Sequence, residues 1–124
     1  MARFIRLLFS HQILPQKQLD DMLKLIDEKN ITLIQEKEGF IDVGQGLGIG
    51  LVYVKNVGLQ WMHAGGRLGY ESLFAYDPCN NIVVTLAYNT RPNSEFVFMK
   101  IFQEIQRTLQ MFQETHTLPA YCHF

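Results

Sequence analysis

The feature that most restricts the fold of this chain is a change in the spacing of its apolar residues near Gly44. Before that position apolar residues recur at intervals of three and four, and from there to residue 88 they alternate or form short runs. After residue 93 the intervals of three and four return. The first spacing is typical of amphipathic helices and the second of strands. We therefore predict an α+β fold, in which an antiparallel sheet is packed by N-terminal helices and a long C-terminal helix.

Helices are predicted at both ends of the chain. The first has its apolar stripe at Phe4, Leu7 and Leu8. A second stripe follows Pro15, a residue favoured in the first turn of a helix, and consists of Leu19, Met22, Leu23 and Ile26. Residues 28–43 mix charged residues with one short apolar run, residues 31–34, so we predict a connection that holds at most one short strand. Near the other end, Asn93 or Ser94 is predicted to cap the long helix.

Strands are predicted across the middle of the chain. They cover residues 44–54, 59–62, 69–76 and 82–88, with turns at residues 55–58 and 77–81. The continuous apolar run of the last strand is typical of a central strand that is buried on both faces. Four alternating glycines lie in the first strand, and their spacing does not fit the dinucleotide-binding pattern. Glycines on one face of a strand indicate that another element packs closely against the backbone.

Composition limits the classes of protein to which this chain can belong. Its 124 residues, 48% of them hydrophobic, predict a single domain over residues 1–124. Eleven Lys and Arg and twelve Asp and Glu are interspersed, so the chain has no basic stripe and a nucleic-acid partner is not expected. Apolar stretches are too short for a membrane span. The pairing of the two cysteines, Cys79 and Cys122, stays open.

His63 is the strongest candidate for a functional side chain. It ends a predicted strand and precedes Ala64, Gly65 and Gly66, where small side chains would let another molecule lie against the backbone. The alternative is a partly buried histidine before a glycine turn. His116 and the C-terminal tail do not have the spacing of a structural zinc site, so neither a metal nor a cofactor is expected.

Several segments of the chain together resemble the C-terminal part of the serine β-lactamase-related hydrolases. This family includes class C β-lactamases, D-alanyl-D-alanine carboxypeptidases and related esterases. The segments are residues 46–50, the His63-Ala64-Gly65-Gly66 stretch, residues 69–78 and residues 82–89, and residues 4–15 resemble the preceding helices. The resemblance implies a partial β-lactamase/transpeptidase-like fold, with the chain as a C-terminal fragment of a larger domain. It also implies that the parent is periplasmic or secreted, whereas the location of this chain is unknown.

The resemblance assigns roles to the residues around His63. Family members carry a Lys-Thr-Gly or His-Thr-Gly strand beside the nucleophile, and His63-Ala64-Gly65 matches it. His63 would act as an electrostatic or proton-handling partner, and the Gly66 N–H would supply half of an oxyanion hole. Ala64 and Gly65 would border an acyl or peptide-like substrate. Ala64 replaces the usual threonine, which removes a hydroxyl expected to bind a substrate carboxylate.

The other two family elements are missing from this sequence. It contains neither a Ser-x-x-Lys nor a Tyr-x-Asn segment. We therefore expect the chain to be inactive alone, as the C-terminal portion of an acyl-enzyme-forming hydrolase. The alternative is a noncatalytic interaction module that keeps part of the fold.

The resemblance also predicts self-association. In the resembled fold, the strand that matches residues 82–88 pairs on one side with an N-terminal strand that this chain lacks. A bare, apolar strand edge is a template for strand addition. We therefore predict a homodimer formed by antiparallel pairing of residues 82–88.

Overall fold

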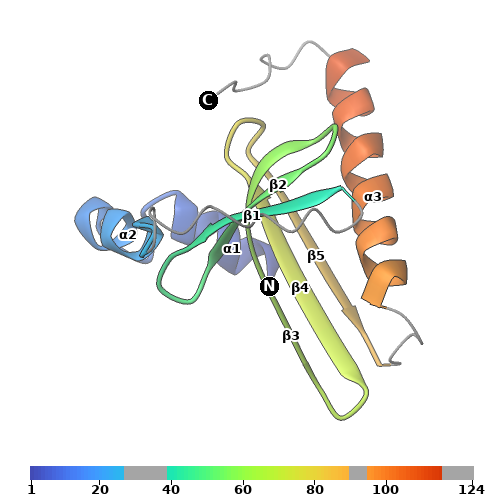
Figure 1. Cartoon of the computed structure of the whole chain (residues 1–124). Coiled ribbons are helices and arrows are strands. Elements are labelled where there is room, and N and C mark those ends of the chain that lie inside the picture. Colours follow the sequence, from blue (N-terminus) through green and yellow to red (C-terminus); the bar gives the residue numbers. More distant parts are fainter. Residues whose placement is uncertain (27–38, 90–94, 116–124) are drawn as a thin grey trace.

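Three helices and a five-stranded antiparallel sheet make up the described part of the chain (Figure 1). The structure is a computed structural model, and it describes residues 1–26, 39–89 and 95–115. The helices are α1 (Ala2–Phe9), α2 (Gln16–Leu23) and α3 (Glu95–Thr115). The strands are β1 (Phe40–Gln45), β2 (Gly50–Val54), β3 (Gly58–Arg67), β4 (Tyr70–Asp77) and β5 (Ile82–Tyr88), and they lie in the sheet in this order. The predicted α+β class is confirmed.

The sheet lies between α1 on one face and α3 on the other. Successive residues of a strand point to opposite faces. Tyr76 of β4 stacks on Phe9 of α1, with ring centroids 4.1 Å apart. The preceding residue, Ala75, belongs to the buried cluster that includes Phe102 of α3. Figure 1 shows α1 behind the sheet and α3 along its β5 side.

The main hydrophobic core lies between the sheet and α3. Its buried members are Phe40, Val54, Val57, Met62, Leu73, Ala75, Val84 and Phe102. One polar pair crosses this core: Gln106 Nε2 of α3 donates a hydrogen bond to Gln60 Oε1 of β3 at 3.1 Å, and both residues are fully buried. Gln60 Nε2 and Gln106 Oε1 are buried without a hydrogen-bond partner among the described residues. Loss of the one bond between the two amides would leave both wholly unmatched, so this bond favours one position of α3 over the sheet. Among the described residues, no helix is long and apolar enough to cross a membrane.

The N-terminal half of the sheet differs from the sequence prediction. Residues 44–54 do not form one strand, because β1 ends at Gln45, residues 46–49 form a turn, and β2 begins at Gly50. β1 itself begins at Phe40, inside the segment predicted as a connection. The second helix ends at Leu23 rather than reaching Ile26. The short apolar run at residues 31–34 and the cap at residues 93–94 lie outside the described residues.

The turn between β1 and β2 packs against the end of α2. The Leu47 N–H donates a hydrogen bond to the Met22 carbonyl at 2.8 Å, so this loop satisfies one of the carbonyl groups in the last turn of α2. A Cβ on Gly46 would lie 2.5 Å from the same carbonyl oxygen, which leaves room for glycine alone. The prediction that an element packs closely against these glycines is confirmed at Gly46.

β5 occupies the end of the sheet rather than its centre. It pairs with β4 along its length, and no described strand lies on its other side. The prediction of a central strand buried on both faces is therefore wrong. Its apolar sequence has another cause: α1 and α3 both contact β5, one on each face.

The turn between β4 and β5 is organised by a buried aspartate. Asp77 is 2% exposed, and its Oδ1 accepts the backbone N–H groups of Cys79 at 2.9 Å and Asn80 at 3.1 Å. Its Oδ2 accepts the side-chain amide of Asn80 at 2.7 Å. The predicted turn at residues 77–81 is confirmed.

Cys79 is disulfide-bonded, and Cys122 lies outside the described residues.

Candidate functional site

The four candidate residues, 63 to 66, lie within β3, which continues to Arg67. The prediction that His63 ends a strand is therefore wrong, and so is the alternative of a partly buried histidine before a glycine turn, because His63 is exposed. The turn is made by the next two residues, Leu68 and Gly69, with φ angles of 51° and 85°. Positive φ at both central residues is typical of a type I′ hairpin, whose twist matches the flanking strands.

The second half of β3 has one strand neighbour. β2 pairs with β3 from Gly58 to Met62, whereas β4 pairs with it as far as Arg67. Residues 63–67 are all exposed, and no described strand adjoins them on the side away from β4. Alternate residues of an antiparallel strand direct their N–H and C=O groups to opposite sides. Part of this backbone is therefore available to a ligand.

The two glycines of this stretch have different surroundings. A Cβ on Gly65 would meet no atom within 4 Å, so the backbone there borders open space. A Cβ on Gly66 would lie 2.7 Å from Glu71 Cγ and 3.2 Å from the Tyr70 carbonyl oxygen. Glycine at position 65 leaves the backbone of β3 accessible to a ligand, whereas glycine at position 66 makes room for the side chain of Glu71.

Glu71 links the candidate strand to the edge of the sheet. Gly66, Glu71 and Tyr88 are directly paired across β3, β4 and β5. The Tyr88 hydroxyl donates a hydrogen bond to Glu71 Oε2. Neither Glu71 nor Tyr88 was singled out from the sequence. The signal that could have found them is the two-residue turn at residues 68–69, because it fixes which residues face each other.

A shallow groove of about 690 Å³ follows this row of residues. Its described lining consists of Gly65, Gly66, Arg67, Tyr70, Glu71, Ser72, Ala87, Tyr88 and Asn89. The pairs Arg67–Tyr70 and Gly66–Glu71 are neighbours in the register, so the side chains of Arg67 and Tyr70 leave the sheet on the opposite face from that of Glu71. On the α3-facing side, the Glu71 carboxylate and the Tyr88 ring are the polar and the flat apolar groups that the groove offers.

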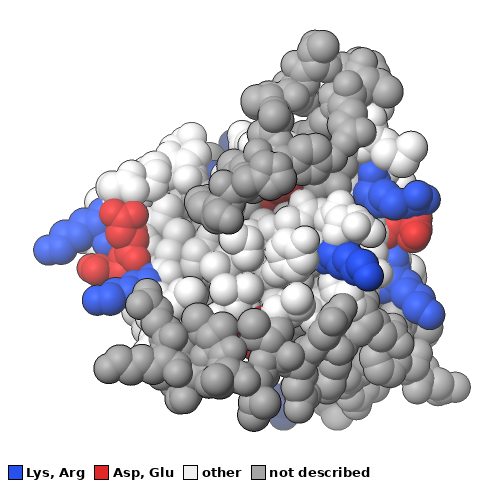
Figure 2. Space-filling view, turned by 45° about the horizontal axis from the view of Figure 1, so that its top comes forward, with Lys and Arg blue, Asp and Glu red and all other residues white. Residues whose placement is uncertain are grey.

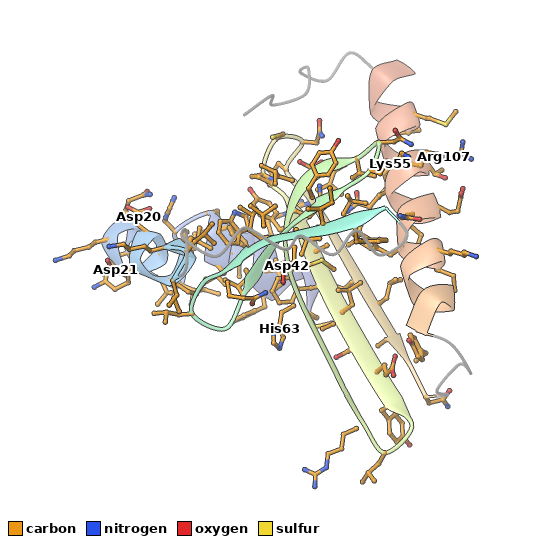
Figure 3. All side chains as sticks on the ribbon, in the orientation of Figure 1. Asp20, Asp21, Asp42, Lys55, His63 and Arg107 are labelled. Carbon is orange, nitrogen blue, oxygen red and sulfur yellow. The ribbon has the colours of Figure 1, made fainter. Side chains whose placement is uncertain are left out.

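His63 is exposed and projects from β3 on the side of the sheet that α1 covers (Figure 3). Its direct partner on β4 is Phe74, and Ser72, which pairs with Gly65, is its diagonal neighbour on the same face. Within the described residues no side-chain hydrogen bond is made to the imidazole. Ala64 and Gly66 alternate to the opposite, α3-facing side. The structure therefore places the four candidates on one exposed strand but directs His63 away from Glu71.

One described side chain with a shifted pKa lies outside the groove. Burial raises the pKa of Tyr76 above its ordinary value, and the neighbouring Asp77 carboxylate raises it further, while Arg6 of α1 lowers it. This tyrosine belongs to the packing of α1 on β4, so its pKa reports on the fold rather than on the candidate site.

The charged side chains of the described residues form two separate groups on one face of the molecule. On the face shown in Figure 2, Lys, Arg, Asp and Glu lie toward two opposite sides, with uncharged surface between them. Within the described part of the chain, no three His, Cys, Asp or Glu residues are placed to hold a metal ion.

Comparisons with protein-family models, with curated proteins and with solved structures find no match to this chain.

Proposed function

We propose that the chain is the C-terminal part of a serine hydrolase that works through a covalent acyl-enzyme, with β3 bordering its active site. The fold would then be part of a β-lactamase/transpeptidase-like domain. The observation that supports this most is the exposed stretch of β3 beyond Met62, where no described strand lies on the side away from β4 and a Cβ on Gly65 would meet open space. An acyl or peptide-like substrate fits such a stretch because it offers its own N–H and C=O groups.

The site residues would act as follows. The Gly66 N–H would donate to the substrate oxygen on which negative charge develops, a contribution of about 10²- to 10³-fold in rate for one such donor. His63 would supply positive charge or handle a proton beside the nucleophile. Ala64 and Gly65 would lie along the substrate. The serine nucleophile would come from residues outside the printed sequence, which contains no Ser-x-x-Lys.

A noncatalytic interaction module is the second candidate. The observation that favours it is the open side of β5, a seven-residue strand without a charged residue or proline. Charges and prolines are the means by which proteins usually protect an edge strand from pairing. For the chain as printed, we propose that two copies associate by antiparallel pairing of residues 82–88. In a complete hydrolase of the resembled fold, an N-terminal strand would occupy that edge.

The sequence encoded upstream of Met1 tests the two candidates against each other. A Ser-x-x-Lys segment there, followed by a Tyr-x-Asn segment, is expected for the hydrolase. An open reading frame without them would refute the hydrolase and favour the module. The purified chain should hydrolyse neither a chromogenic β-lactam nor a short-chain ester above the buffer rate. Turnover together with fluorophosphonate labelling of a serine of this chain would contradict the proposal.

A further inference from the structure

A row of small residues crosses three strands on the α1-facing side of the sheet. Gly65, Ser72 and Ala87 are directly paired across β3, β4 and β5, and all three line the groove of about 690 Å³. We call these three residues the trough floor. A Cβ on Gly65 would meet no atom within 4 Å, and Ala87 is exposed. The space above the trough floor is therefore open to a ligand.

Larger side chains stand on both sides of the trough floor. Residues two positions apart in a strand point to the same face and lie roughly 7 Å from each other. Arg67 and Tyr70, which pair directly, therefore form one wall. His63 and Phe74, also a direct pair, form the other wall. α1 packs on Tyr76, the next residue of β4 on this face, so the trough lies just beyond the part of the sheet that α1 covers.

The two walls repeat the same arrangement of chemical groups. On β3, each wall contributes an N–H donor, either the imidazole of His63 or the guanidinium of Arg67. On β4, each wall contributes an aromatic ring, either that of Phe74 or that of Tyr70, whose side chain is 66% exposed. Within the described part of the chain, the side chains of His63, Arg67 and Ser72 form no hydrogen bond or ion pair. The trough thus has available polar donors above β3 and aromatic rings above β4.

The charge on this face of the strands is positive. Successive residues of a strand point to opposite faces, so Glu71 and Asp77 of β4 are directed to the α3-facing side. No other Asp or Glu lies in β3, β4 or β5. Arg67 is therefore the one permanently charged side chain that these three strands direct toward the trough, and it favours an anionic ligand.

We propose that the trough binds an aromatic carboxylate. The ring of the ligand would lie over Ser72, between the two aromatic walls. Its carboxylate would lie over Gly65, where Arg67 and His63 can donate hydrogen bonds to it. Neighbouring strands lie about 4.8 Å apart, which is close to the distance between the centre of an aromatic ring and the oxygens of a carboxylate attached to it.

The pairing of donors with rings is what favours an aromatic carboxylate over an inorganic anion. An inorganic anion would use the donors above β3 but would leave both rings above β4 uncovered. This inference does not require the proposed hydrolase, whose substrate would lie along the open side of the β3 backbone rather than over the α1-facing side of the sheet.

Fluorine NMR of 4-fluorobenzoate titrated with the full chain tests this proposal. The wild type should cause a saturable shift of the fluorine resonance at millimolar concentration. Arg67→Gln, which removes the charge but keeps a long polar side chain, should weaken binding by about 10-fold. Gly65→Leu should abolish binding because its side chain fills the space above the trough floor. Arg107→Gln makes the same change of charge on α3, at an exposed site, and should leave binding unchanged.

Two further fluorinated probes separate the parts of the ligand. The uncharged 4-fluorobenzamide and the ringless trifluoroacetate should each bind at least about 10-fold more weakly than 4-fluorobenzoate. Equal binding of the benzamide would overturn the role of the carboxylate, and equal binding of trifluoroacetate would overturn the role of the ring.

The proposal as a whole fails if the wild type leaves the fluorine resonance of 4-fluorobenzoate unchanged. It also fails if Arg67→Gln and Arg107→Gln bind this probe equally well. Amide NMR spectra of each variant show whether its fold is kept. If Gly65→Leu does not fold, the comparison between the two arginine variants still decides the outcome.

Discussion

The hairpin between β3 and β4 allows a sharp test of the structure, because its turn contains a residue in an unfavourable conformation. Leu68 has a φ of 51° and a side chain that is 88% exposed. The left-handed region costs an ordinary L-residue roughly 1 to 2 kcal/mol, whereas asparagine adopts it readily. Asn-Gly is also a preferred pair in type I′ turns. Leu68→Asn should therefore raise the free energy of unfolding by about 1 kcal/mol, since it loses almost no buried surface.

Urea and thermal unfolding measure this gain. A change of about 1 kcal/mol corresponds to a rise in Tm of roughly 4 °C for a domain of this size. The matched control is Leu68→Ala, which removes the same exposed side chain but keeps an ordinary residue at positive φ. It should change stability by less than about 0.5 kcal/mol. Equal effects of the two substitutions, or destabilisation by asparagine, would refute the turn geometry.

Three further predictions concern the fold. Asp77→Ala should lower the free energy of unfolding, measured by urea titration, by about 2 to 3 kcal/mol, because three hydrogen bonds are lost at a buried site. An equal loss from Asp77→Asn would contradict this explanation. Gly46→Ala should lower the free energy of unfolding by about 1 to 3 kcal/mol because its Cβ meets the Met22 carbonyl. Gly65→Ala, whose Cβ lies in open space, should leave it almost unchanged. Equal destabilisation by the two substitutions would contradict this prediction. Because the pKa of Tyr76 is raised in the folded chain, this tyrosine ionises first in the unfolded state, so the free energy of unfolding should fall as pH rises above about 10. Tyr76→Phe should reduce that pH dependence. Identical pH profiles of the free energy of unfolding for the wild type and Tyr76→Phe would contradict the buried position of this tyrosine.

The strands with strong local patterns could be predicted from the sequence. β5 has the bounds that were expected, and β4 differs by one residue at each end. Each apolar run is bounded by residue types that favour turns, so the ends of these two strands can be read from the local sequence. The start of α2 after Pro15 is predictable for the same reason.

Other features depend on contacts between distant residues and could not be predicted. β1 was missed because its register shifts between Asp42 and Gly44, which breaks the alternation that identifies a strand. The extent of β3 could not be predicted because residues 64–66 carry no side chains that favour a strand, and because the turn that ends β3 uses a leucine with positive φ. The hydrogen bond between Glu71 and Tyr88 depends on the pairing of three strands, which no local pattern specifies.

We propose that residues 63–67 of β3 border a site for an acyl or peptide-like ligand, and amide NMR of the chain can detect such binding residue by residue. The ¹⁵N-labelled chain is titrated to millimolar concentration with the methyl ester of N-acetyl-D-alanyl-D-alanine, which has no free carboxylate and so does not depend on the hydroxyl that Ala64 lacks. We expect saturable shifts of the amide resonances of residues 63–67 and of Glu71, and no shifts of the β5 amides except that of Tyr88. Shifts confined to other strands, or none in this stretch at the highest concentration, would contradict it.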